Sequence, residues 1–412
     1  MLRTRVYLST NMSNCGEHIK DLREQIDSPC NKICADCRCT IVKYASLSYG
    51  VFLCELCGVA HQSLNGNIKK ISTDENNSVI WSDDSVSRLR KFGGNKAINQ
   101  KLEASLPVYF RRPWPGLECP VFLREAFIKS KYVHEEFTSD AIARGAQSQF
   151  ACSFKSGVLL KKLRDTTTFC ERFFELSVEG NYLRYYVKPS DSQPKQSLDL
   201  ERLNFTFISS KDFGLPPHTA LIQFVQDCST RHMFIRSEDS RTIINWYNAI
   251  RLGKYHRLCL GLSGMGVTLS PCELSKRLTR DIDMYGWLSK TGPRKKDAWR
   301  RRWCMILHRH FLYTDHPLSP FSKGELFIGS NKEGYSITNS TPDGWNRHNG
   351  FPLTIHTSAR PFVFAADKKE EQEKWLEVIQ KIINIPLTLS EHKQAAMVAK
   401  KRTNALDFLK NS

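Results

Sequence analysis

Two pairs of cysteines near the start of the chain constrain its fold more than any other feature. Cys34 and Cys37 form one C-x2-C pair, and Cys54 and Cys57 form a second pair after 16 intervening residues. Thiolates at this spacing are typical of a tetrahedral zinc site. Four sulfur ligands leave no open coordination position on the metal. We therefore expect one structural Zn²⁺ that folds the surrounding loop, and not a catalytic metal.

The distribution of the cysteines indicates a reducing compartment. Seven of the 14 cysteines lie in the first 60 residues, and the other seven are scattered singly. A secreted disulfide scaffold would be shorter and more evenly cross-linked, so we expect a cytoplasmic protein. Cys30 and Cys39 lie close to the four-cysteine pattern and are further candidate ligands. Residues 1–18 lack the apolar stretch of a signal peptide and are interpreted as a leader.

The charge of the chain predicts a polyanionic partner. Its 412 residues carry 60 Lys and Arg against 42 Asp and Glu, a formal net charge of +18. Nucleic acid and the anionic cytoplasmic leaflet both attract such a protein, and charge alone does not choose between them. No apolar run in the sequence reaches the roughly 18 residues that span a bilayer, so we expect any membrane contact to be peripheral. The length predicts about two to three domains.

The second half of the sequence contains a repeat. The segment 157–161 (GVLLK) resembles 286–290 (GWLSK), and each is followed by an aromatic, basic stretch at 169–176 or 299–307. Each copy ends in a helix-like segment whose tryptophan, Trp246 or Trp375, lies 89 residues after its glycine. Between these points, apolar residues alternate with polar ones, which predicts half-buried antiparallel strands. We therefore expect two barrels, at 150–256 and 283–387, each closed by a C-terminal amphipathic helix.

This repeat resembles the pleckstrin-homology (PH) fold. In phosphoinositide-binding PH domains, a lysine at the end of the first strand and two basic residues in the second strand converge on a polyphosphorylated headgroup. The second copy has Lys290, Arg300 and Arg302 at these places, and its intervening loop adds Arg294, Lys295 and Lys296. Several phosphates require several cations, and arginine offers a planar fork for their oxygens. The second barrel is therefore predicted to bind phosphoinositides.

The first copy has a weaker version of the same pattern. Lys161, Lys162 and Arg164 follow its first strand, and Arg172 matches the second arginine of the motif. Cys170 replaces the other expected cation, and Glu171 lies beside the site. A headgroup pocket and a barrel that only packs or binds protein are both open interpretations. If the first barrel binds lipid, we expect a lower affinity than in the second.

The cysteine region resembles the domain of Arf GTPase-activating proteins (ArfGAP). The match includes GVFLCELCGVAH at 50–61 and the segments 92–107, 109–115 and 127–137. An ArfGAP domain at 19–138 followed by two PH domains is the layout of the ArfGAPs with dual PH domains, the centaurin-alpha group, of which the chain is identified as a divergent member. The resemblance implies a mostly helical zinc domain with a small sheet, an α+β multidomain chain, an Arf-type small GTPase as partner, and recruitment to the plasma membrane or another phosphoinositide-containing membrane.

One residue departs from the family pattern. The family has an arginine finger five residues after the last zinc cysteine, and this position is Gln62 here. An arginine finger neutralises charge in the transition state and accelerates GTP hydrolysis by about 10³–10⁵-fold. Glutamine is neutral, so GTPase activation is in doubt. Two interpretations follow, a GAP that uses another cation and a non-catalytic membrane adaptor with a pseudo-GAP domain; the substitution favours the second.

A zinc protein of the GATA type, which binds nucleic acid, is a further alternative. It is disfavoured because the cations concentrate in the repeat and not after the second cysteine pair. We therefore expect no nucleic-acid partner, and we expect a monomer. Motifs of common hydrolases, such as GxSxG and HExxH, are absent from the sequence. The segment 257–282 is predicted to pack between the barrels, and 388–412 is interpreted as a basic tail.

Overall fold

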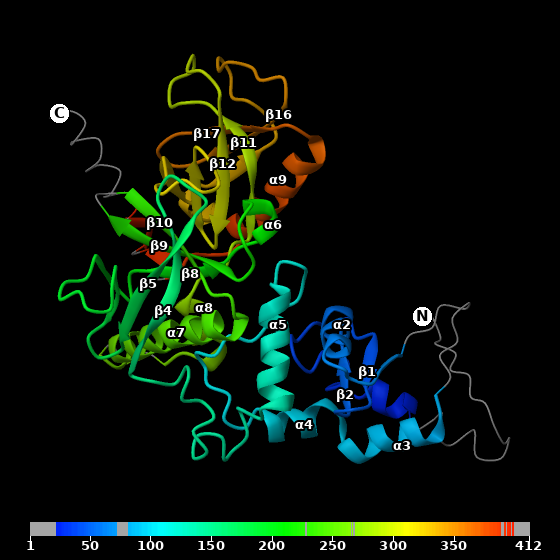
Figure 1. Ribbon diagram of the computed structural model, residues 1–412. Helices are drawn as coiled ribbons and strands as arrows, with labels where there is room; N and C mark the ends of the chain where they lie inside the picture. Colours follow the sequence, from blue (N-terminus) through cyan, green and yellow to red (C-terminus); the bar gives the residue numbers. More distant parts are fainter. Residues whose placement is uncertain are drawn as a thin grey trace. The chain divides into compact units, whose positions relative to one another are not determined.

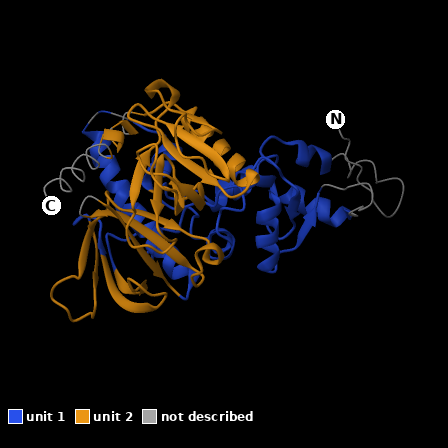
Figure 2. Ribbon diagram, turned by 90° about the horizontal axis from the view of Figure 1, so that it is seen from above, with its two compact units in different colours: residues 1–155, 176–181, 238–278 blue, residues 156–175, 182–237, 279–412 orange. Residues whose placement is uncertain are grey.

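The computed structural model describes residues 22–71, 81–226, 229–264, 266, 268–388, 391, 392, 394–396 and 398. The expected leader at 1–18 and most of the expected basic tail at 388–412 lie outside the described residues. The chain divides into two compact units (Figure 2). Unit 1 comprises 1–155, 176–181 and 238–278, and unit 2 comprises 156–175, 182–237 and 279–412.

Unit 1 contains the cysteine region, which combines a small sheet with helices as expected. The three strands lie in the order β2–β1–β3 and are antiparallel. The elements are β1 (Tyr44–Ser46), β2 (Val51–Leu53), α2 (Glu55–Ser63), β3 (Ile68–Lys70), α3 (Asp83–Phe92), α4 (Gly94–Leu102), α5 (Val121–Ile128) and a π-helical turn (Lys129–Val133). A Cβ at Gly58 would lie 2.9 Å from the ring of Tyr44. This close approach requires glycine at the start of α2.

Two further helices belong to unit 1, α7 (Ser240–Ser263) and α8 (Pro271–Leu278). Asp239 caps the start of α7 by accepting hydrogen bonds from the backbone N–H groups of Arg241 and Thr242. α7 contains the helix-like segment around Trp246 that the sequence predicted, and it continues to Ser263, past the expected domain end at 256. Gly253 is a buried position in the middle of this helix. The first seven residues of the segment predicted as a linker, 257–282, are therefore helical.

The strands of the first repeat form a seven-stranded antiparallel sheet in the order β7–β6–β5–β4–β10–β9–β8 (Figure 1). The closure of the sheet places β4 beside β10, with Lys161 opposite Ile235. The elements are β4 (Phe154–Lys162), β5 (Phe169–Ser177), β6 (Tyr182–Tyr186), β7 (Gln196–Asp199), β8 (Asn204–Phe207), α6 (Ser210–Phe213), β9 (Thr219–Gln226) and β10 (Ser229–Arg236).

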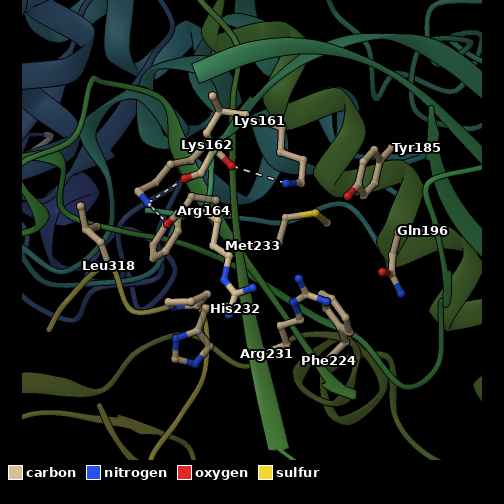
Figure 3. Close-up of a pocket in the computed structure, with 13 residues that line it drawn as sticks. Lys161, Lys162, Arg164, Tyr185, Gln196, Phe224, Arg231, His232, Met233 and Leu318 are labelled. Atoms are coloured by element: carbon tan, nitrogen blue, oxygen red, sulfur yellow. Dashed lines mark hydrogen bonds between the residues drawn. The ribbon is translucent and has the colours of Figure 1, made fainter. Parts of the chain in front are cut away.

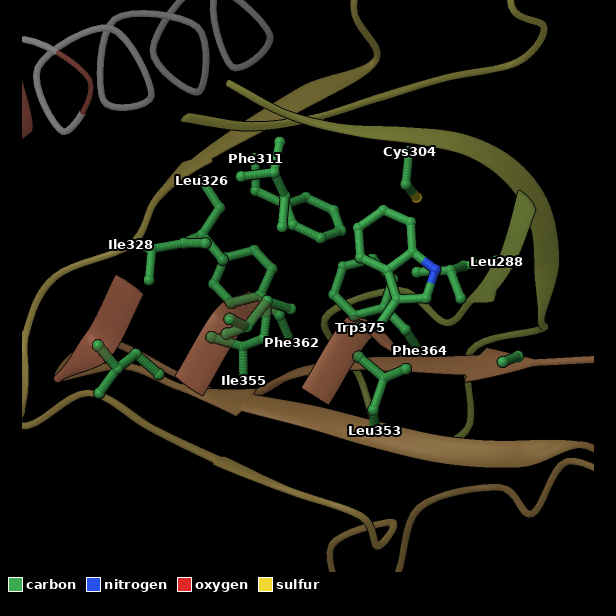
Figure 4. Packing of buried hydrophobic residues seen from close by; sticks show 14 residues of the cluster. Leu288, Cys304, Phe311, Leu326, Ile328, Leu353, Ile355, Phe362, Phe364 and Trp375 are labelled. Carbon is green, nitrogen blue, oxygen red and sulfur yellow. The ribbon is translucent and has the colours of Figure 1, made fainter. Parts of the chain in front are cut away.

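The second repeat has the same topology, with the order β14–β13–β12–β11–β17–β16–β15. The elements are β11 (Met284–Lys290), β12 (Arg300–Leu307), β13 (His310–Thr314), β14 (Gly324–Phe327), a 3-10 turn (Asn331–Glu333), β15 (Ser336–Thr338), β16 (Phe351–His356), β17 (Phe362–Ala366) and α9 (Lys369–Ile383). Trp375 of α9 inserts among core residues of several strands, including Leu288, Phe311 and Leu353 (Figure 4). The expected role of this tryptophan in closing its barrel is confirmed.

A second apolar cluster joins the two barrels within unit 2. Phe213 of the first barrel lies against Trp303 of the second, with ring centroids 5.4 Å apart. Leu221 and Phe234 from the first barrel, and Met305 and Leu312 from the second, belong to the same buried cluster. The barrels therefore share a hydrophobic core and pack as one body within unit 2.

No helix among the described residues is both long enough and apolar enough to span a bilayer.

Candidate functional site

The four cysteines of the C-x2-C pairs come together in the structure. Cys34, Cys37, Cys54 and Cys57 are buried, and their sulfur atoms all lie within 4.8 Å of one another. Cys54 immediately precedes α2, and Cys57 lies in its first turn. A zinc–sulfur bond of about 2.3 Å requires neighbouring sulfurs at just under 4 Å in a tetrahedron. The cluster therefore fits one tetrahedral metal ion.

The surroundings of the cluster also fit a metal held by thiolates. The Arg124 guanidinium is buried and donates a hydrogen bond from Nη1 to Cys57 Sγ at 3.0 Å. Its Nη2 donates to the carbonyl oxygens of Trp114 and Gly116. A buried cation is stable beside a sulfur that carries negative charge. Arg124 thus connects α5 to the metal centre and offsets part of the charge of four thiolates.

A buried ionic network supports the first cysteine pair from behind. Asp36, between Cys34 and Cys37, accepts hydrogen bonds from Lys131 Nζ at 3.0 Å and Tyr132 Oη at 2.8 Å. His61 Nε2 lies 2.9 Å from the other Asp36 oxygen. Burial alone would raise the pKa of Asp36, but Lys131 and the hydrogen bond with His61 lower it to about 2. Asp36 is therefore ionised and fixes the backbone of this pair.

Glu103 extends this network toward the protein surface. One of its oxygens lies 2.8 Å from Lys131 Nζ, and the other is paired with Arg112 and Arg38. Arg112 also donates to the carbonyl oxygen of Asp36 at 2.6 Å. These contacts show that three of the cations near the cysteines have structural partners.

Gln62, the residue at the arginine-finger position, lies on the exposed side of α2. The preceding His61 points inward to Asp36, and a step of about 100° per residue turns Gln62 outward. Two arginines of the described cysteine region have other partners. Arg112 pairs with Glu103, and Arg124 donates a hydrogen bond to Cys57 Sγ. Both guanidinium groups are thus engaged away from Gln62.

The basic residues of the second barrel gather at one end of its sheet. Lys290 is directly opposite Arg300 across β11 and β12, and Leu288 is opposite Arg302. Residues that are opposite each other on paired strands lie on the same face of the sheet. Lys290, Arg300 and Arg302 therefore start from the same face as Leu288, whose side chain is part of the barrel core. Arg301 points to the other face, where it pairs with Asp367.

The loop of the second barrel between β11 and β12 is held in place from two sides. Its single acid, Asp297, accepts a hydrogen bond from the backbone N–H of Arg294 at 2.9 Å. The backbone N–H of Asn346 donates to the carbonyl oxygen of Lys295 at 3.0 Å. Asp297 thus shapes the loop, while the side chains of Arg294, Lys295 and Lys296 are exposed. These contacts fix the conformation of the loop that carries the three cations.

Arg302 differs from its neighbours because it already has an acidic partner. Its Nη1 lies 2.7 Å from Asp315 Oδ1, and Lys323 Nζ lies 3.0 Å from the other Asp315 oxygen. A phosphate would have to compete with Asp315 for this guanidinium.

The first barrel has a pocket at the corresponding end (Figure 3). Lys161, Lys162 and Arg164 line it, as does Arg231 of β10, with Tyr185 and Gln196 from β6 and β7. Lys161 points toward the ring of Tyr185, with Nζ 5.1 Å from its centroid. Lys162 is turned away and donates to the carbonyl oxygens of Leu163 and Arg164. Lys161 Nζ makes one longer hydrogen bond, at 3.4 Å, to the carbonyl oxygen of Lys162, so this ammonium group keeps two donors for a ligand.

Arg172 also belongs to this basic cluster, although it does not line the pocket. Burial lowers the pKa of Lys161, and the positive charges of Arg172 and Arg231 lower it further. None of these three cations has an ion pair with a carboxylate among the residues that the structure describes. The first barrel thus concentrates positive charge that its own acids do not neutralise.

Some functional residues were not found from the sequence. Arg124, Arg231 and Tyr185 belong to none of the sequence motifs described above, and the packing of strands and helices brings them to their sites. For Arg231 a signal was available, because β10 is adjacent to β4 in any barrel of this topology.

Comparison with known proteins gives the family. The ArfGap model, described as a GTPase activating protein for Arf, matches residues 18–141, and the PH domain model matches 153–255 and 282–384. The chain is 31% identical over 362 residues to Arf-GAP with dual PH domain-containing protein 2 of Rattus norvegicus, an alignment that covers 87% of this chain and 91% of that one.

The protein of the same name from Homo sapiens is also 31% identical, over 87% of this chain and 90% of its own length. The ADP-ribosylation factor GTPase-activating protein AGD12 of Arabidopsis thaliana is 32% identical over 167 residues, which cover 39% of this chain and 47% of that one. Given one ArfGAP domain, two PH domains and a relative matched over nine-tenths of its length, the chain belongs to the family of Arf-GAP proteins with dual PH domains.

Proposed function

We propose that this protein binds an Arf-type small GTPase at membranes to which its two PH barrels are recruited by polyphosphorylated phosphoinositides, and that it activates GTP hydrolysis only weakly. In this proposal the protein is an adaptor and not a working GAP. Its ArfGAP domain still binds the GTPase but accelerates GTP hydrolysis little. The proposal of weak activation rests on Gln62, which is exposed on α2 at the position where the family has its arginine finger.

Membrane recruitment is supported by the two basic barrel ends. In the second barrel, Lys290, Arg300 and the exposed loop cations share one end of the sheet. In the first, Lys161, Arg172 and Arg231 lie close together without acidic partners among the described residues. Arginine and lysine clusters of this kind bind several phosphates through charge-assisted hydrogen bonds. We assign the stronger site to the second barrel, because its cations are more numerous.

The proposal that the ArfGAP domain keeps its fold is supported by its cysteine cluster and by its buried ionic network. The four cysteines form a compact cluster, and the Asp36–Lys131–Glu103 network is complete. We assign the metal as Zn²⁺, since four thiolates in a closed tetrahedral set favour it. Cys34, Cys37, Cys54 and Cys57 would hold it, and it would stabilise the loop between the two pairs. In this proposal the metal takes no part in GTP hydrolysis.

The central experiment measures single-turnover GTP hydrolysis by an Arf-type GTPase bound to phosphoinositide-containing liposomes. We expect the wild-type protein to accelerate hydrolysis little, and Gln62→Arg to accelerate it by at least ten-fold more. The reason is that a guanidinium on the exposed face of α2 supplies the positive charge that glutamine lacks.

The matched control is Gln100→Arg, which adds the same charge at an exposed position of α4. It should leave the rate unchanged. Rapid hydrolysis with the wild-type protein would contradict the proposal, because another group would then have to supply the charge. Binding of the GTPase to the wild-type protein, measured separately with a non-hydrolysable GTP analogue, distinguishes weak activation from failure to bind.

Membrane recruitment is tested by liposome sedimentation. Arg300→Ala combined with Arg302→Ala should reduce binding to phosphoinositide vesicles at least five-fold, since the basic end of the second barrel loses two of its positive charges. Lys369→Ala combined with Lys374→Ala, which removes two exposed lysines of α9, is the control. Equal binding by the wild type and the double arginine variant would contradict the assignment of the second barrel.

A further inference from the structure

The basic pocket of the first barrel is not formed by that barrel alone. Leu318 and Pro320, which line it, belong to the segment 315–323 between β13 and β14 of the second barrel. Leu318 is seen at the edge of the pocket, across from Tyr185 and Gln196 (Figure 3). Both barrels lie within unit 2.

Backbone pairing fixes the 315–323 segment against β10. The backbone N–H of His232 donates to the carbonyl oxygen of Pro320 at 2.8 Å, and that of Ser322 donates to the carbonyl oxygen of Thr230 at 2.9 Å. Arg231 of β10 and Phe321 of this segment are paired in an isolated antiparallel β-bridge. The segment thus acts as an additional strand-like edge beside the first barrel.

Phe321 provides a surface for two arginines of the pocket. The guanidinium carbon of Arg231 lies 5.0 Å from the centroid of its ring, and that of Arg164 lies 5.7 Å from it. An aromatic face attracts a guanidinium and limits its orientations. One side chain of the second barrel therefore positions two cations that line the pocket of the first.

The 315–323 segment is itself held rigidly by the second barrel. Asp315 is paired with Arg302 and Lys323. Thr314 Oγ1 donates to the carbonyl oxygen of His316 at 2.7 Å, and the backbone N–H of His316 donates to Ser319 Oγ at 3.0 Å. These bonds define a turn that presents Pro320 and Phe321 to the first barrel.

We propose that the first barrel's anion site is composite: Lys161, Arg164 and Arg231 supply its cations, Phe321 of the second barrel positions the two arginines, and the site takes a polyphosphorylated inositol. The proposal deepens the proposed function and rests on it, because it specifies how one of the two barrels recognises its ligand. The same chemistry is found in a membrane phosphoinositide and in a free inositol polyphosphate. Both sources are therefore compared in the test.

The experiment uses the full chain with Arg300→Ala, which weakens the second site, as the common background. A soluble inositol tetrakisphosphate is titrated by calorimetry. We expect Arg231→Ala to weaken binding at least ten-fold, since a charge-assisted hydrogen-bond donor is lost. Phe321→Ala should weaken binding three- to ten-fold, although Phe321 carries no charge, and Phe321→Tyr should restore it because the ring face is kept.

The controls separate an effect on the pocket from an effect on folding. Arg202→Ala removes an exposed arginine of the first barrel outside the pocket, and Phe351→Ala removes a partly exposed phenylalanine of the second barrel. Both should bind normally. The thermal unfolding midpoint of each variant is measured, and vesicles that contain either a phosphoinositide or only phosphatidylserine replace the soluble ligand in a parallel series. Binding to the soluble ligand but not to phosphoinositide vesicles would identify a free inositol polyphosphate as the ligand.

Two results would overturn the inference, and they are distinguishable. If the background protein binds but Phe321→Ala binds equally well, the second barrel does not contribute to the site, and the proposed function is unaffected. If the background protein does not bind at all, while the protein with Arg300 intact does, the first barrel has no anion site, and the part of the proposed function that concerns it fails as well.

Discussion

Lys290 is a buried lysine, which is an unusual environment for a side chain that is proposed to bind a phosphate group. Its Nζ donates to the carbonyl oxygen of Thr291 at 2.7 Å and lies 5.0 Å from the ring centroid of Tyr313. Burial lowers its pKa to about 8, and the nearby charge of Arg360 contributes in the same direction. Burial therefore destabilises the protonated form relative to that of an exposed lysine, and a bound phosphate would stabilise it.

We predict that this residue makes headgroup binding at the second barrel dependent on pH. Anion binding stabilises protonated Lys290, so the affinity should fall as the pH rises from 7 to 9 through its pKa of about 8. Titration of a soluble inositol polyphosphate in an Arg231→Ala background measures this dependence. Lys290→Arg should lose most of it, because arginine stays charged over this range. The same slope in both proteins would assign the dependence to another group.

At the residue scale, prediction from the sequence succeeded for side chains that belong to a local pattern. The four cysteines were predicted to cluster, and they do. Lys290 and Arg300 lie opposite each other across two paired strands, and their shared role in binding a headgroup stays a prediction. Arg231 and Phe321 were not predicted, since they reach the first pocket through pairing between distant parts of the chain.

At the scale of single elements, the end of α9 depends on one buried arginine. Arg309 donates from its guanidinium to the carbonyl oxygens of Ile382 and Ile385 at 3.1 and 2.6 Å, and from Nε to Glu391 at 2.8 Å. These carbonyls lie at the C-terminal end of the helix, where the last turn lacks internal partners. Arg309 therefore caps α9 and holds Glu391 against the barrel.

We predict that Arg309→Met lowers the free energy of unfolding of the second barrel by about 3–5 kcal/mol, because it leaves Glu391 and several carbonyl groups buried without a partner. Chemical denaturation followed by tryptophan fluorescence measures this change. Arg301→Met serves as the control, since Arg301 has an exposed ion pair with Asp367 that contributes less than about 1 kcal/mol. A similar small loss in both variants would show that Arg309 is dispensable.

A second element with a testable requirement is the loop between the cysteine pairs. We predict that a strong zinc chelator unfolds this region, because the metal–sulfur bonds that hold the two cysteine pairs together are lost and the thiolates take up protons. Hydrogen exchange should show lost protection in β1, β2 and α2, while β12 stays protected. Cys57→Ser should resemble the chelated protein. Unchanged protection of α2 after complete metal removal would show that packing alone maintains the fold.

The sequence identified the elements of the barrels better than their boundaries. Alternation of apolar and polar residues predicted strands in both repeats, and seven-stranded sheets are present in each. α7 extends to Ser263, past the domain boundary expected at 256 and into the segment predicted as a linker. The small helix α6, whose Phe213 joins the barrels, was not predicted, since four residues are too few for a periodic pattern.

At the scale of the whole molecule, the shared core of the barrels is the feature that the sequence concealed. Trp303 and Met305 were seen as part of an aromatic, basic strand, but they lie in a buried cluster with Phe213 and Leu221. Both faces of β12 are thus covered, since Cys304 and Ile306 face the interior of its own barrel. A pattern search cannot tell which second surface a strand packs against.

We predict that the barrels unfold together because of this core. Phe213→Ala, in the first barrel, should destabilise the second by about 3–5 kcal/mol through the cavity it leaves beside Trp303. Native-state hydrogen exchange of β12 in the full chain measures the effect. Phe154→Ala, at an exposed position of β4, should leave β12 unchanged. If Phe213→Ala lowers protection only in the first barrel, the two barrels are independent folding units.

The shared core also limits how the two repeats can diverge in evolution. Internal duplication usually frees one copy to change while the other preserves the ancestral role. Here a substitution at Trp303 or Phe213 alters a surface that its sister repeat must match. We therefore expect the residues at these two positions to change together across homologous sequences. A chimera that exchanges only one repeat would pack poorly at the interface between the barrels.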